Sequence, residues 1–161
     1  MRERAKALSK QSKNNHQAVL ADYREATALL RGLQKDSDQR DFPDAKKMLI
    51  SSLADISYNA LFVRGDEEAL AAADEALQLS PSELSIMTKK AHALMYLGRT
   101  DEAVRIYLEH KGKPLSSETW DKSIADDFAE LKAAGRAHPL MDRILEEMGK
   151  ERSHANKSRP K

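Results

Sequence analysis

The chain has 161 residues and an almost balanced charge, with 27 Lys and Arg against 26 Asp and Glu. This length fits a single domain. A formal net charge of +1 provides no overall attraction to nucleic acid or to an anionic membrane. The sequence contains no cysteine, which excludes disulfides, thiolate metal sites and a cysteine nucleophile within it.

The charges are unevenly distributed along the chain. Residues 1–40 contain nine Lys or Arg and five Asp or Glu, residues 41–149 contain thirteen and twenty, and residues 150–161 contain five and one. An acidic body therefore carries two basic ends. The first residues lack the apolar stretch of a secretory signal, and no later run approaches the roughly 20 apolar residues that span a bilayer. We therefore expect a cytoplasmic protein without a membrane segment.

The N-terminal part of the chain divides into an arm and a helix. Residues 1–13 are polar, basic and only weakly periodic, which predicts a flexible basic arm. Apolar residues then recur between Val19 and Leu33 at alternating spacings of four and three, which line one face of a helix. The pattern predicts a helix over residues 15–36.

Four helices are predicted in the middle of the chain. Proline cannot continue the helical hydrogen-bond ladder, and glycine is a frequent breaker, so these residues mark the loops. The predicted helices cover residues 45–64, 67–79, 82–97 and 101–111, with Ser82 as the N-cap of the third. Together they form two helix–turn–helix pairs.

Two more helices are predicted within residues 117–149. Ser116 or Ser117 can cap the first of them, and Gly135 ends it. The tail, residues 150–161, is basic and is expected to be disordered. The chain is thus expected to contain about seven helices and no strand.

The two central helix pairs repeat with a period of 34 residues. A shift of that length pairs Ser57 with Ala91 and Ala69 with Ala103. Antiparallel helices pack closely only where small residues let their backbones approach. We therefore expect these four residues to be buried contacts between helices.

Two stretches within this repeat carry a resemblance to a known family. Residues 67–81 read EEALAAADEALQLSP, and residues 91–107 read AHALMYLGRTDEAVRIY. Both resemble the tetratricopeptide repeat (TPR) family, and the resemblance covers about residues 45–114. It implies an all-α fold built as a right-handed superhelical stack of antiparallel helix pairs. The helices at 15–36 and 117–149 would flank these repeats and complete a domain over residues 14–149.

The sequence also departs from the family pattern. Gly98 falls opposite Arg64 in the 34-residue register, which predicts that the first turn is displaced by one residue. Only two repeats are clear, whereas about three are normally needed to bury a continuous core. An ordinary helical bundle is the alternative interpretation.

No motif for catalysis or for metal binding is found. The five histidines do not have the spacing of a zinc site, and no glycine-rich phosphate loop or nucleophile elbow is present. The acidic cluster of Asp126, Asp127 and Glu130 is interpreted as a solvated helix surface. We therefore expect no enzymatic activity, no cofactor and no metal.

The family resemblance implies a binding surface on the concave face, which the first helix of each repeat forms. The implied residues are Asp55, Tyr58, Phe62, Lys89, His92 and Tyr96. Their spacings of three, four and seven place each trio on one stripe of its helix. A structural role is the alternative for Phe62 and Tyr96, which could pack between helices instead.

The expected function is that of an adaptor or scaffold, a non-catalytic protein–protein interaction module that binds a protein or peptide partner. No small-molecule substrate and no membrane is expected. Nucleic acid is disfavoured because the basic ends lack interleaved aromatic residues. The alternative is a dedicated TPR-type chaperone for a secreted bacterial effector, which rests on size and fold alone.

Overall fold

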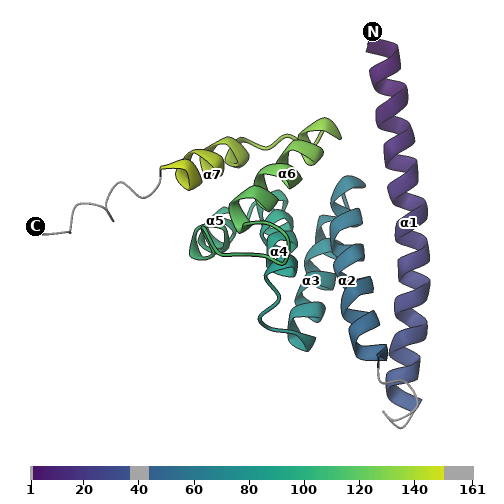
Figure 1. The fold of residues 1–161 in the computed structure, drawn as a ribbon. Helices are drawn as coiled ribbons and strands as arrows, with labels where there is room; N and C mark the ends of the chain where they lie inside the picture. The colour runs from purple at the N-terminus through teal and green to yellow at the C-terminus, as the bar shows by residue number, and fades with distance from the viewer. Residues whose placement is uncertain (1, 37–43, 151–161) are drawn as a thin grey trace, which may run out of the picture.

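The computed structural model describes residues 2–36 and 44–150, with side chains for residues 15–33 and 44–150. Within these ranges the protein is all-α, with seven helices and no sheet (Figure 1). The helices are α1 (Arg2–Asp36), α2 (Ala45–Phe62), α3 (Asp66–Leu79), α4 (Leu84–Tyr96), α5 (Thr100–Glu109), α6 (Trp120–Ala133) and α7 (Pro139–Gly149).

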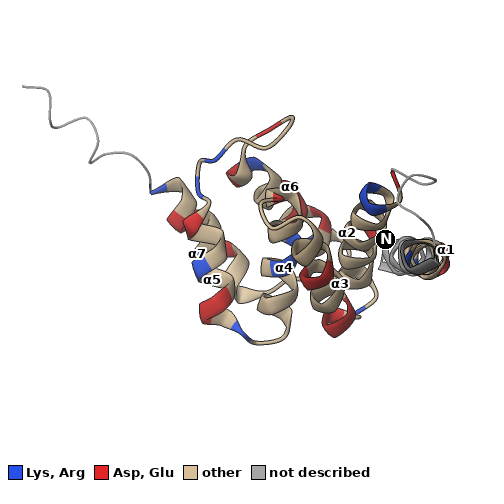
Figure 2. Cartoon of the chain, turned by 90° about the horizontal axis from the view of Figure 1, so that it is seen from below, with Lys and Arg blue, Asp and Glu red and all other residues tan. Residues whose placement is uncertain are grey.

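The helices pack largely in chain order. From α1 to α5 each helix contacts the next, and α6 contacts α7. Further contacts join α2 with α4, α4 with α6, and α5 with α7. Seen from below, α1 lies at one edge of the array and α5 and α7 lie at the other (Figure 2). Over the described residues, no helix is both long enough and apolar enough to cross a membrane.

The N-terminal segment differs from its expectation. Residues 2–13, expected to be a flexible arm, are the first part of α1. They are rich in Ala, Lys and Arg, which favour helix, and extending an existing helix avoids the cost of nucleation. The expected disordered tail, residues 150–161, lies outside the described residues except for Lys150, the C-cap of α7.

Packing of α1 uses an apolar face and two pairs of charges. Leu20 and Leu30 are buried. On the flank of this face, Arg24 forms a bidentate ion pair with Glu68 of α3. Arg31 forms a second bidentate ion pair with Glu75 of α3. Both ion pairs are exposed, so they add little to the free energy of unfolding. Because they lie seven residues apart on each helix, they fix the register of α1 against α3.

The small residues of the repeat are buried as the sequence predicts. Ser57, Ala69, Ala91 and Ala103 are all 0% exposed. The Ser57 hydroxyl donates to the backbone carbonyl oxygen of Ala69 at 2.8 Å, so this polar group is satisfied inside the α2–α3 contact. The prediction that these positions are helix contacts is confirmed.

Two helix starts differ from the predictions. At α4 the N-cap is Glu83, without a side-chain capping bond, rather than Ser82. At α6 the N-cap is Thr119, whose hydroxyl accepts from a backbone N–H of the first turn, rather than Ser116 or Ser117. The loop before α6 closes through an isolated antiparallel bridge between Pro114 and Thr119, and residues 116–118 bend within it, so the helix begins later than expected.

The turn between α2 and α3 and the turn between α4 and α5 have the same geometry and lie 34 residues apart. Arg64 follows α2 with φ of 65°, and Gly98 follows α4 with φ of 75°. In each turn the next backbone N–H donates to the carbonyl oxygen five residues before it, at 2.9 Å. The expected displacement of the first turn is therefore wrong. Arg64 adopts the left-handed conformation that glycine adopts in the second turn.

This conformation makes Arg64→Gly a stabilising change. The left-handed region costs a residue with a Cβ roughly 1–2 kcal/mol, and glycine avoids this cost while losing more chain entropy on folding. We expect the free energy of unfolding, measured by urea denaturation, to rise by about 1 kcal/mol. Arg64→Ala is the matched control because it keeps the Cβ. Equal stability of the glycine and alanine variants would contradict the prediction.

Candidate binding groove

The predicted concave-face residues lie on two neighbouring helices, α2 and α4, which contact each other. Their exposure differs, however. Phe62 and His92 are buried, whereas Asp55, Tyr58, Lys89 and Tyr96 are half-buried. The six residues therefore do not form one open surface, and their contacts divide the face into two parts.

His92 belongs to the protein core, beneath α6. Its Nε2 donates to the Asp127 carboxylate at 3.0 Å, and its Nδ1 lies 2.7 Å from the hydroxyl oxygen of Tyr107. The ring also contacts Phe128, with centroids 5.3 Å apart. Because His92 is 0% exposed, it joins α4 to α6 and α5 and does not reach a ligand on the surface.

Tyr96 is bound to the turn that follows α6. Its hydroxyl donates to the backbone carbonyl oxygen of Arg136, and the Arg136 guanidinium carbon lies 3.8 Å from the centre of the Tyr96 ring. The same guanidinium donates to the Asp66 carboxylate at 2.8 Å. Burial raises the pKa of Tyr96 to about 12, although the nearby Arg136 charge opposes this shift.

Tyr58 and Phe62 are covered from two sides. The Tyr58 hydroxyl donates to Glu130 on α6, and burial together with this hydrogen bond raises the pKa of Tyr58. The edge of its ring contacts Phe62, with centroids 5.0 Å apart. Phe62 in turn stacks on His16 of α1 at 4.1 Å. We call Tyr58, Phe62, His92 and Tyr96 the closed half of the face.

Lys89 and Asp55 lie at the border of the closed half. The Lys89 ammonium donates to the backbone carbonyl oxygen of Ser85 at 2.9 Å and lies 5.4 Å from the centre of the Tyr58 ring. Burial lowers the pKa of Lys89, while nearby carboxylates oppose the shift. Asp55 faces α1, where its hydrogen bond with Tyr23 raises the pKa of that phenol.

Toward the N-terminal ends of α2 and α4 the face is open. A hollow of about 540 Å³ lies between α2 and the α3–α4 turn. Its apolar lining comes from Ile50, Ala54 and Ile86. At its rim, Lys46 and Lys47 are exposed and have no ion-pair partner among the described side chains. This hollow offers an apolar surface beside two lysines, and the carboxylates of Asp44 and Glu83 also line it.

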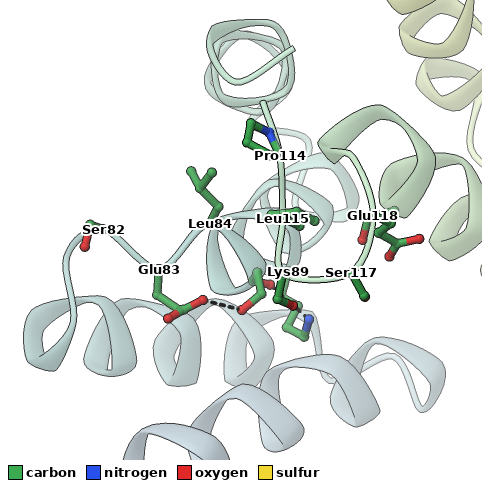
Figure 3. Close-up of a pocket in the computed structure, with 11 residues that line it drawn as sticks. Ser82, Glu83, Leu84, Lys89, Pro114, Leu115, Ser117 and Glu118 are labelled. Atoms are coloured by element: carbon green, nitrogen blue, oxygen red, sulfur yellow. Dashed lines mark hydrogen bonds between the residues drawn. The ribbon is translucent and has the colours of Figure 1, made fainter. Parts of the chain in front are cut away.

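A second hollow of about 450 Å³ lies between the start of α4 and the α5–α6 loop, and it shares Glu83 and Ser85 with the first. Figure 3 shows Glu83 and Glu118 on opposite sides of it, with Lys89 between them. The hydroxyl groups of its lining come from five serines: Ser82, Ser85, Ser116, Ser117 and Ser123. We call the two hollows together the open half of the face.

One acidic residue of α6 differs from its expectation. Asp126 and Glu130 are exposed as expected, and Glu130 accepts a hydrogen bond from Tyr58. Asp127, by contrast, is half-buried and holds His92 in the closed half. One signal could have revealed this: Gly135 follows α6 with φ of 77°, much as a glycine follows α4. Treating α6 as the first helix of a third hairpin would have placed its carboxylates beside α4.

Known proteins provide no comparison for this arrangement. No protein-family model matches the chain, and no curated protein or solved structure is significantly similar to it. Over the described residues, no group of three or more His, Asp or Glu is placed to hold a metal ion.

Proposed function

We propose that this protein is a non-catalytic interaction module, an adaptor or scaffold, that binds an extended peptide segment of a partner protein in the open half of the α2–α4 face. The observation that carries the proposal is a pair of adjoining, solvent-open hollows, one between α2 and the α3–α4 turn and one between the start of α4 and the α5–α6 loop. They share Glu83 and Ser85, so one peptide can occupy both.

The proposed fold is a TPR-like stack of three helix hairpins, α2–α3, α4–α5 and α6–α7. Support comes from the identical turns after α2 and α4, from the buried small residues and from the contacts between alternate helices. In such a stack the first helices of the hairpins share one face. The open half lies on the first helices of two hairpins, which is where the family resemblance implies a ligand.

The two hollows favour different parts of a peptide. The first takes an apolar side chain against Ile50 and Ala54, because removal of apolar surface from water is the main source of binding energy. The second offers serine hydroxyls and Lys89, which can hydrogen-bond to a peptide backbone or a polar side chain. Lys46 and Lys47 at the rim favour a carboxylate next to the apolar side chain.

A substitution that fills the first hollow tests this function. Ala54→Arg places a long side chain in the first hollow, and Ala71→Arg, on the exposed surface of α3, is the matched control. Peptides are selected on the wild-type protein from a displayed library of random sequences. We expect them to bind the control normally and to lose at least about tenfold in affinity, about 1.4 kcal/mol, on Ala54→Arg.

Melting curves of both variants serve as the folding control for this experiment. Selected peptides that bind Ala54→Arg with wild-type affinity would place the site elsewhere. Failure to enrich any peptide on the wild-type protein would contradict peptide binding itself.

A further inference from the structure

The helix α1 is much longer than its neighbour α2 and extends past its end. α1 contains 35 residues, whereas α2, its neighbour in the array, contains 18. His16 stacks on Phe62, the last residue of α2, so the part of α1 before His16 extends beyond the end of α2 (Figure 1). At 1.5 Å per residue this extension is about 20 Å long.

The extension and the packed part of α1 differ in charge. Residues 2–14 contain five Lys or Arg and one Glu. In the packed part, Asp22 and Glu25 are exposed, and neither has an ion-pair partner among the described side chains. The basic residues there, Arg24 and Arg31, are bound to carboxylates of α3. The outer surface of the packed part is therefore acidic, and the extension is basic.

The acidic residues share their face with exposed apolar residues. Ala18, Asp22, Glu25 and Leu29 follow one another at spacings of four, three and four, which places them on one stripe of the helix. Leu29 is 66% exposed, the highest value among the exposed large hydrophobic side chains of the described residues. This stripe points away from α2 and α3, since the buried face of α1 carries Leu20.

A helix of about 13 residues without tertiary contacts is marginal in water, even for good helix formers. A helical segment of this length that projects past α2 gains stability from a surface that covers it. A fitting surface is acidic and partly apolar, and the outer stripe of α1 has that composition. A second copy of the chain supplies such a stripe.

We propose that α1 pairs with α1 of a second copy of this chain in antiparallel orientation. The basic extension of each copy then lies along the acidic outer stripe of the other. A two-fold axis produces both contacts at once, because each copy contributes the same two surfaces. Parallel pairing would instead place extension against extension and Asp22 against Asp22, so that like charges face each other.

Sedimentation equilibrium of the full chain tests the pairing. We expect a mass of about twice 18.1 kDa at low salt and weaker association at high salt, because salt screens exposed charges. The double change Asp22→Lys with Glu25→Lys should yield a monomer. Asp101→Lys with Glu109→Lys on α5 changes the charge equally at two exposed sites and should remain a dimer.

Two outcomes of that experiment would overturn the proposal. One is a wild-type chain that is monomeric at its highest soluble concentration, which would leave the extension to another acidic partner. The other is a folded Asp22→Lys, Glu25→Lys variant, judged by circular dichroism, that dimerises as well as the wild type. Removing residues 1–14 supplies a second variant, and it should also be monomeric.

Single cysteines test the orientation, since the sequence contains none of its own. In the antiparallel pairing, residues 2–14 of one copy lie opposite residues 16–28 of the other. Asn15, which is exposed, then meets Asn15 of the second copy. Asn15→Cys should therefore form a disulfide-linked dimer on mild oxidation, and Leu29→Cys should not. Efficient linkage through Leu29→Cys would indicate parallel pairing and overturn the proposal.

Discussion

Replacing Arg136 with leucine is expected to lower the free energy of unfolding by about 3 kcal/mol. The Arg136 side chain is 4% exposed, and its guanidinium donates to both oxygens of Asp66 at 2.8 and 3.0 Å. Leucine would leave the Asp66 carboxylate without its partner and would remove the cation from the Tyr96 ring. This expected fall in the free energy of unfolding is at the lower end of the range for broken buried ion pairs, because the Asp66 side chain is 18% exposed.

A double-mutant cycle separates this effect from simple loss of packing. Asp66→Ala combined with Arg136→Leu removes both charges, so the double variant should recover part of the stability lost in Arg136→Leu. Urea denaturation gives the free energies of unfolding. A loss below about 1 kcal/mol in the single variant, or strict additivity in the double variant, would show that the pair contributes little.

Ala103→Trp is expected to destabilise the protein by about 1–3 kcal/mol or more, because it forces a large ring into a site that has no room. Ala103 is 0% exposed on α5, and it occupies the repeat position that the equally buried Ala69 occupies on α3. A tryptophan there must separate α5 from its neighbours. Arg105→Trp, at an exposed position of the same helix, is the matched control.

Thermal melting checks this prediction. We expect a clear fall in melting temperature for Ala103→Trp and a small change for the control. An unchanged melting curve for Ala103→Trp would mean that the contact can open without cost, and the proposed hairpin stacking would lose its main support.

The sequence predicted the helices of this fold well, for a physical reason. Helical periodicity, proline and glycine act within a few residues of each other, so α2 to α5 could be placed to within three residues at each end. The start of a helix was predicted less well where several neighbouring residues could serve as its N-cap. At α6 several residues could serve as the N-cap, and the bridge that closes the preceding loop selected Thr119.

The candidate site was predictable only in part. Spacing grouped Tyr58 with Lys89, and the structure places the Lys89 ammonium 5.4 Å from the centre of the Tyr58 ring, whereas their part in binding stays a prediction. Spacing could not reveal that α6 covers one half of the α2–α4 face, because the contact between His92 and Asp127 joins residues 35 positions apart. Contacts of that range depend on the angle between hairpins, which no local pattern encodes.

The single tryptophan makes the far end of the array separately observable. Trp120 is 0% exposed, and its indole N–H donates to the backbone carbonyl oxygen of Tyr107 at 2.9 Å. Its fluorescence therefore reports the junction of α5 with α6, whereas the far-ultraviolet dichroism also reports α1 at the opposite edge. In an array held by nearest-neighbour contacts these two signals need not change together. Non-coincident curves would reveal that α1 melts before the junction does, and coincident curves would indicate a single cooperative unit.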